Sequence, residues 1–187
     1  MIDQLKPFLP LLLVHVIIFA IASAFFYPLY QGKELVQSDN IQLRGTLSEV
    51  AKYRIEEGRI IKWSNKEFAG MPTLTGSRSN PYFYFHAVLT TVFPGPIAIL
   101  FLLFSGFYVL ISAFDLKVWI RALSGYAYAF STFNLISLEA GHDNKVYAMA
   151  LMAPILAGVI WVYKGQLTKG VIVTKLATGY QIIIGHI

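Results

Sequence analysis

The chain has 187 residues, of which 56% are hydrophobic and 13% are charged. Soluble domains carry about a quarter charged residues, so this composition and a mean hydropathy of +0.59 predict a membrane protein. The net charge of +5 is scattered among apolar segments and acidic residues, which argues against nucleic acid as a partner and favours membrane lipid. The absence of cysteine excludes disulfides, thiolate zinc sites and a cysteine nucleophile.

Apolar segments long enough to cross a bilayer recur along the chain. The first ends in Tyr27 and Pro28, an aromatic boundary suited to the membrane interface. The second opens with Pro94-Gly95-Pro96, which suits a helix start, and the third is rich in small residues that permit close helix packing. We therefore predict one all-α membrane domain, a polytopic transmembrane helical bundle with about five spans. The predicted spans are residues 8–26, 94–114, 119–138, 146–163 and 170–187.

Residues 27–93 carry mixed charge and are predicted to form a long extracytoplasmic loop with short juxtamembrane helices. Thr46-Leu47-Ser48-Glu49 has the form of a capping box and predicts a helix from Leu47 to about Glu57, with Gly58 as its stop. The aromatic stretch from Tyr82 to Phe93 is expected to lie along the membrane surface.

The short loops predict the orientation of the chain. The basic residues of the short loops fall mostly on one side, at Lys6, Lys117, Arg121, Lys164 and Lys169. The opposite short turn carries Lys145, which is balanced by Glu139 and Asp143. The positive-inside rule then puts the N-terminus in the cytoplasm. The long loop and the 139–145 turn share the opposite face. The last apolar segment ends without a flanking charge, so we expect an N-terminal piece of a longer protein, or a chain that needs further helices.

Asp39, in the acidic turn Gln37-Ser38-Asp39-Asn40, is the first candidate for chemistry. A carboxylate at the bilayer surface can take a proton from an acceptor hydroxyl, or bind a divalent cation that bridges a phosphate. The alternative is that the segment is an ordinary Asx-type turn.

The turn from Glu139 to Lys145 is the second candidate. His142 and Lys145 could hold a lipid phosphate or a departing phosphate, with the amide of Asn144 beside them. Asp143 could orient His142 or ligate a metal, and the alternative is an ordinary interfacial turn. Glu139 is expected to pair with Lys145 or a basic loop residue, or to face a wet cavity, because an unpaired carboxylate is costly in lipid.

Other polar and aromatic residues have two interpretations each. Arg44 could meet a phosphate, and Trp63 could form a platform for a sugar or prenyl chain or simply pin the loop to the membrane. His15 is expected to hydrogen-bond a neighbouring helix, and Lys175 either snorkels to the interface or points inward. The chain has no P-loop, dinucleotide fingerprint, His-Glu-x-x-His motif or nucleophile elbow.

Taken together, the motifs form a recognisable order. After the first span come Tyr27-Pro28, Gly32-Lys33, Gln37-Ser38-Asp39, Tyr53-Arg54, Trp63-Ser64-Asn65, Phe68-Ala69-Gly70-Met71-Pro72, Gly106-Phe107-Tyr108 and Gly141-His142-Asp143-Asn144-Lys145. This order resembles the N-terminal part of YfhO-family membrane proteins, particularly the version common in Bacteroidetes, over essentially the whole chain.

The resemblance implies a GT-C glycosyltransferase in the bacterial inner membrane. Such proteins transfer a sugar from a polyprenyl-phosphate sugar donor on the extracytoplasmic face, here to a cell-envelope acceptor. Their first external loop carries an acidic residue needed for transfer, and Asp39 matches it. Family members are much longer than this chain. The chain has a single Asp39 in place of a paired Asp-x-Asp, so a requirement for Mg²⁺ or Mn²⁺, held by Asp39 and Asp143, stays open.

Two alternatives belong to other functional classes. One is a non-catalytic membrane transport or assembly protein for lipid-linked envelope polymers, which predicts that His15, Glu139 and Lys175 line a continuous path through the bundle. The other is a structural membrane fragment without activity of its own.

Overall fold

The computed structural model describes residues 9–46, 48–59, 63–65, 69–72, 91, 93 and 95–184. This part of the chain is mostly helical, so the predicted all-α class is confirmed. Its longer helices are α2 (Leu9–Phe25), α7 (Gly95–Ser112), α8 (Val118–Ala129), α9 (Thr132–Ala140), α10 (Asp143–Tyr163) and α11 (Leu167–Ile184). The shorter elements are α3 (Tyr27–Tyr30), α4 (Ser38–Thr46), α5 (Ser48–Glu57), β1 (Trp63–Ser64) and β2 (Met71–Pro72).

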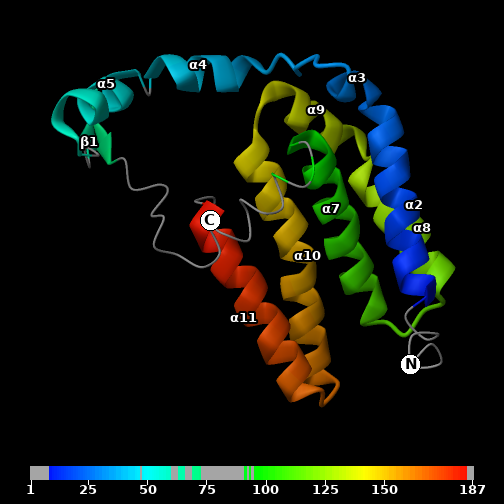
Figure 1. The fold of residues 1–187 in the computed structure, drawn as a ribbon. Coiled ribbons are helices and arrows are strands. Elements are labelled where there is room, and N and C mark those ends of the chain that lie inside the picture. The colour runs from blue at the N-terminus through cyan, green and yellow to red at the C-terminus, as the bar shows by residue number, and fades with distance from the viewer. Residues whose placement is uncertain are drawn as a thin grey trace.

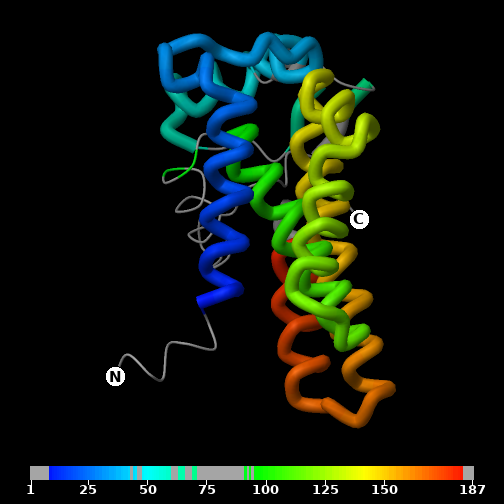
Figure 2. Tube along the Cα trace, turned by 90° about the vertical axis from the view of Figure 1, so that its right-hand side faces the viewer, coloured from blue at the N-terminus to red at the C-terminus, as the bar shows by residue number. Residues whose placement is uncertain are grey.

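The long helices form an up-and-down bundle around α7. Helix α7 packs against α2, α8 and α10, and α11 packs on the far side of α10 (Figure 1). The core lies where these helices meet, and its largest fully buried side chains include Phe104, Leu100 and Leu103 of α7 and Ile18 of α2. As Figure 2 shows, α2 rises from the N-terminal end and the chain then crosses the opposite end of the bundle before α7 descends.

A proline in α10 explains the close packing of α10 against α7. Pro154 has no N–H, so the helix cannot supply a donor to the carbonyl of Ala150 one turn earlier. Gly106 of α7 lies against that carbonyl, and a Cβ added at Gly106 would collide with the Ala150 oxygen. The glycine therefore lets the α7 backbone cover the carbonyl that the proline leaves without its helical partner.

Small residues also allow close contacts elsewhere in the bundle. A Cβ at Gly125 of α8 would lie 3.0 Å from the backbone oxygen of Phe104, so the predicted close packing of this segment is confirmed there. Helices α10 and α11 form an antiparallel hairpin in which a Cβ at Gly158 would lie 2.7 Å from the oxygen of Gly170.

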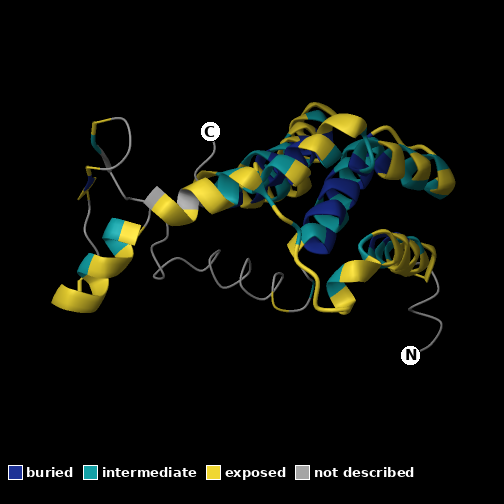
Figure 3. Cartoon of the chain, turned by 90° about the horizontal axis from the view of Figure 1, so that it is seen from above, coloured by how far each residue is buried: buried dark blue, intermediate teal, exposed yellow. Residues whose placement is uncertain are grey.

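Helices α4 and α5 and the pair β1–β2 form an arm that runs across one end of the bundle and beyond it (Figure 1). The arm is largely exposed, whereas buried residues gather where the bundle helices face one another (Figure 3). The two strands are antiparallel, pairing Trp63 with Pro72 and Ser64 with Met71.

The Glu49 part of the predicted capping box is wrong, whereas the Thr46 side chain lies outside the described residues. Thr46 ends α4, and the Glu49 carboxylate turns to the strand, where its Oε2 accepts hydrogen bonds from the Ser64 hydroxyl at 3.2 Å and the Asn65 N–H at 3.4 Å. The predicted stop is confirmed, since α5 ends at Glu57 and Gly58 has a φ of +66°. The aromatic stretch from Tyr82 to Phe93 falls almost entirely outside the described residues.

The predicted spans are supported unequally. Among the described helices, α7 and α10 are long and apolar enough to cross a membrane, and α2 is apolar but has 17 residues. The prediction of one uninterrupted helix over 119–138 is wrong, because α8 ends at Ala129 and α9 begins at Thr132. Helix α11 has 18 residues but carries Lys169 and Lys175. The helices suggest membrane association, and the number of spans remains a prediction.

Candidate functional site

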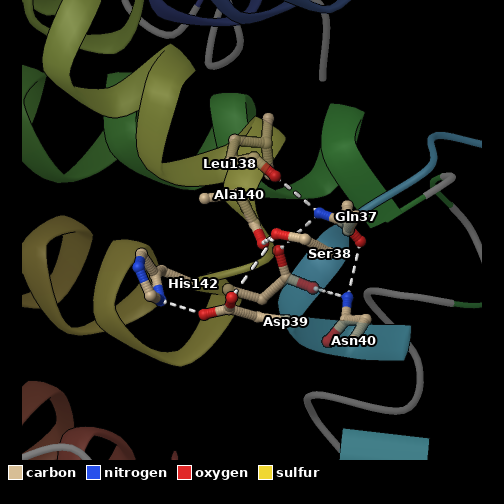
Figure 4. A network of polar contacts seen from close by, with 8 residues as sticks. Gln37, Ser38, Asp39, Asn40, Leu138, Ala140 and His142 are labelled. Carbon is tan, nitrogen blue, oxygen red and sulfur yellow. Dashed lines mark hydrogen bonds and ion pairs between the residues drawn. The ribbon is translucent and has the colours of Figure 1, made fainter. Parts of the chain in front are cut away.

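Two segments a hundred residues apart meet at the end of the bundle where the arm begins. One is Gln37–Asn40 at the start of α4, and the other is Leu138–Asp143 at the turn from α9 to α10. Figure 4 shows the polar side chains of the first segment directed at the second. The predicted convergence of the acidic segment with the histidine-bearing turn is therefore confirmed.

The shape of the second segment follows from Gly141. Helix α9 ends at Ala140, and Gly141 adopts the left-handed conformation with a φ of +95°. This conformation lets the Gly141 N–H bond the Leu138 oxygen at 3.2 Å and the His142 N–H bond the Ser137 oxygen at 3.0 Å, which satisfies carbonyls at the helix end. His142 then forms the N-cap of α10, and Asp143 lies in its first turn.

Asp39 and His142 form the central contact of the site. The distance from His142 Nδ1 to Asp39 Oδ2 is 2.8 Å, and the side chains are 49% and 42% exposed. The alternative of an ordinary Asx-type turn is wrong, because Asp39 lies in the first helical turn of α4, where a carboxylate is favoured by the unpaired N–H groups. The pair is open to solvent and held by two helix starts.

Asp143 holds the two segments together through amide groups. Its Oδ1 accepts a hydrogen bond from Gln37 Nε2 at 3.1 Å, and its Oδ2 accepts one from Asn40 Nδ2 at 3.3 Å. Gln37 Nε2 also donates to the Leu138 oxygen at 2.6 Å, and Asn40 Nδ2 donates to Gln37 Oε1. These hydrogen bonds mean that the Asp143 carboxylate orients the start of the arm, whereas the sequence predicted that it could orient His142.

The positioning role of Gln37 and Asn40 is not apparent from the sequence. Both lie in the stretch that the sequence singles out, but only as turn formers. The signal that could have found them is the end of α9, whose last carbonyls need donors from outside the helix. The Ser38 hydroxyl supplies a further, long contact to the Ala140 oxygen at 3.4 Å.

The side chains around Asp39 and Asp143 fit a divalent cation poorly. Within the described ranges, no group of three or more His, Asp or Glu side chains could hold a metal ion. The two candidate ligands are also committed to different partners, Asp39 to His142 and Asp143 to the two amides. We therefore derive no chemical step from Mg²⁺ or Mn²⁺ held by Asp39 and Asp143.

Three predicted site residues lie close in sequence to the pair, but no contact between any of them and the pair is seen among the described residues. The predicted ion pair between Glu139 and Lys145 is wrong, because the Lys145 ammonium lies 4.8 Å from the ring centroid of Phe133 on α9. Glu139 is exposed and has no ion pair with any described residue. Asn144 is exposed in the first turn of α10.

Arg44 and Trp63 lie farther along the arm. Arg44 is exposed in the last turn of α4. Trp63 belongs to β1, and its ring packs over Gly70, where an added Cβ would lie 2.7 Å from Trp63 Nε1. Figure 1 places β1 at the far end of the arm from the α9–α10 turn, so the structure does not bring Trp63 to the Asp39–His142 pair.

Comparison of the chain with protein-family models, curated proteins and solved structures finds no match. The chemical capacity of the site therefore rests on its geometry. A carboxylate that accepts a hydrogen bond from an imidazole, with both side chains about half exposed, can accept a proton from a hydroxyl that approaches from solvent.

The residues of the alternative transport path are not brought together. The His15 ring packs edge-on against Phe101, Phe104 and Tyr108 of α7, with centroid distances of 5.5 to 5.7 Å. Its Nδ1 lies 2.8 Å from the Leu11 oxygen of its own helix, so the predicted bond to a neighbouring helix is wrong. Glu139 and Lys175 are exposed on α9 and α11. A continuous path through these three residues is not supported.

Proposed function

We propose that this chain is a GT-C-like membrane glycosyltransferase, or the N-terminal part of one, related to the YfhO family that its motifs resemble. The observation that carries the proposal is the 2.8 Å contact between Asp39 and His142. It joins the two segments that the sequence analysis selects as candidates for chemistry, in a site open to solvent at one end of an apolar bundle. A carboxylate in such a place suits a reaction between a lipid-linked donor and a water-soluble acceptor.

In the proposed reaction, Asp39 is the proton acceptor. An acceptor hydroxyl attacks the anomeric carbon of a sugar on a polyprenyl phosphate, and a new glycosidic C–O bond forms. The bond from the anomeric carbon to the phosphate oxygen breaks, and the polyprenyl phosphate leaves with the electron pair. The hydroxyl proton passes to Asp39, whose orientation is held by His142.

The departing phosphate needs positive charge nearby. Lys145 lies one turn beyond His142 on α10, and Arg44 lies one turn and a half beyond Asp39 on α4. We propose that these two cations stabilise the negative charge on the leaving phosphate, with His142 and Asn144 as further hydrogen-bond donors. Lys145 would leave its contact with Phe133 to reach the phosphate.

We also propose that the site faces the extracytoplasmic side of the bacterial inner membrane, with the N-terminus in the cytoplasm. The turns 113–117 and 164–166 lie at the end of the bundle away from the Asp39–His142 pair (Figure 1). Basic residues outnumber acids at those turns, which is the pattern of cytoplasmic loops.

The test is Asp39→Asn in membranes that contain the full-length protein and are supplied with a polyprenyl-phosphate sugar. Asparagine keeps the size of the side chain but cannot accept the hydroxyl proton, so transfer should fall by about 100-fold or more. Asp115→Asn is the matched control, because it removes a carboxylate at the opposite end and should leave transfer unchanged. Near-normal transfer by Asp39→Asn would remove Asp39 from the mechanism.

A further inference from the structure

The end of the bundle opposite the Asp39–His142 pair carries a basic cluster assembled from two turns. Lys164 joins these turns, because its Nζ donates to the Ala113 oxygen at 2.6 Å and lies 2.8 Å from Asp115 Oδ2. Asp115 adopts a φ of +58° at the tip of the first turn, and Gly165 a φ of +79° in the second. The contact brings basic residues from two distant parts of the sequence, Lys117 and Arg121 on one side and Lys164 and Lys169 on the other, into one surface.

A single carboxylate lies among several cations in this cluster. The hydrogen bond from Lys164 and the charge of Lys164 lower the pKa of Asp115, desolvation opposes this shift, and the charges of Arg121 and Lys169 lower the pKa further by smaller amounts. All three cations therefore act on the same carboxylate. Lys117 is exposed beside Asp115 in the same turn. Four cations against one anion leave a net charge of +3 on this surface.

Aromatic rings border the cluster. The Lys169 ammonium lies 3.6 Å from the ring centroid of buried Trp161. Trp119 and Tyr163 are exposed at 63% and 89%. Exposed aromatic residues next to lysine and arginine are typical of the level of lipid headgroups, because the rings prefer the apolar boundary and the cations the phosphates.

We propose that this surface, formed by Lys117, Arg121, Lys164 and Lys169, binds the headgroups of anionic phospholipids. The charge excess selects an anionic partner, and the bordering aromatic rings next to apolar helices select one that lies at a membrane surface. The inference rests on the proposed membrane placement, but not on sugar transfer. The surface would fix the depth of α7, α8, α10 and α11 in one leaflet.

The experiment uses tryptophan fluorescence in lipid vesicles. The chain has three tryptophans, so Trp63→Phe leaves Trp119 and Trp161 as reporters at the cluster. The protein is reconstituted in phosphatidylcholine with a fraction of brominated phosphatidylglycerol or brominated phosphatidylcholine as quencher. We expect quenching to give a relative binding constant at least about five-fold in favour of phosphatidylglycerol at low salt, falling as ionic strength rises.

Two double variants test whether the cluster causes this preference. Lys117→Gln with Lys169→Gln should bring the relative constant to within about two-fold of one. Lys52→Gln with Arg59→Gln on the arm removes the same charge and should leave the preference unchanged. Equal quenching by both lipids in the parent protein, or an equal loss in the arm variant, would overturn the proposal. Absence of quenching by either lipid would contradict the membrane placement itself, whereas the outcome of the Asp39→Asn assay bears only on sugar transfer.

Discussion

At the scale of single residues, the ion pair of Asp39 and His142 contributes little to stability. Both side chains are about half exposed, and exposed ion pairs are worth about 0–1 kcal/mol. The placement of the pair depends instead on its neighbours. Gln37 and Asn40 together bind both oxygens of Asp143, and Gly141 lets the backbones approach closely. The proposed chemistry of the site thus belongs to Asp39 and His142, whereas the residues around them hold the pair in place.

Gly141 is the residue on which this close approach depends most. A Cβ there would lie 3.1 Å from Gln37 Cβ and 3.2 Å from the Asn40 nitrogen, in addition to the strain of a positive φ. We expect Gly141→Ala to lower the free energy of unfolding by about 2–3 kcal/mol, measured by denaturant titration in detergent.

Gly165→Ala separates the cost of the close contact from the cost of backbone strain. Gly165 has a φ of +79° but nothing within 4 Å of an added Cβ, so only backbone strain, about 1 kcal/mol, applies. If both variants lost the same stability, the contact between Gly141 and the 37–40 segment would be refuted.

At the scale of elements, the packing of α7 on α10 depends on two residues that are unusual inside a helix, a proline in α10 and a glycine in α7. Pro154 frees the Ala150 carbonyl, and Gly106 presents bare backbone to it. Gly106→Ala should push the helices apart and lower the free energy of unfolding by about 1–3 kcal/mol, measured in the same titration.

Gly45→Ala is the control for the loss of a helical glycine. Gly45 lies in α4 with nothing within 4 Å of an added Cβ, and alanine favours helix by about 1 kcal/mol over glycine. The two substitutions should therefore change stability in opposite directions. A stabilising effect of Gly106→Ala would contradict the observed contact with α10.

The elements also show what the sequence could and could not predict. Apolar runs and the Pro94-Gly95-Pro96 entrance located α7, and the spacing of charged turns predicted that Asp39 and His142 would lie at one end. The break between Ala129 and Thr132 was not apparent, because no proline or glycine marks it. The break changes the direction of α9, so the sequence could not predict that Glu139 would be exposed and Lys145 would meet Phe133.

At the scale of the whole molecule, the bundle separates two kinds of surface. One end holds the Asp39–His142 pair and the amides that position it, and the other holds the basic cluster joined by Lys164. The arm projects from the first end across the bundle (Figure 1). This division follows from the alternation of helix direction, since α7 and α10 run away from the end with the pair, and α8 and α11 run back from the end with the basic cluster (Figure 1).

The meeting of α4 with the α9–α10 turn is the claim on which the account depends, and the cysteine-free chain allows a direct measurement. In Asp39→Cys with His142→Cys, a short bifunctional thiol reagent should give a cross-linked peptide by mass spectrometry, because the two side chains that the cysteines replace are 2.8 Å apart at their nearest atoms. Arg59→Cys with His142→Cys, whose first cysteine lies beyond α5 on the arm, should give none. Absence of the 39–142 cross-link, or equal yields from the two pairs, would contradict the account.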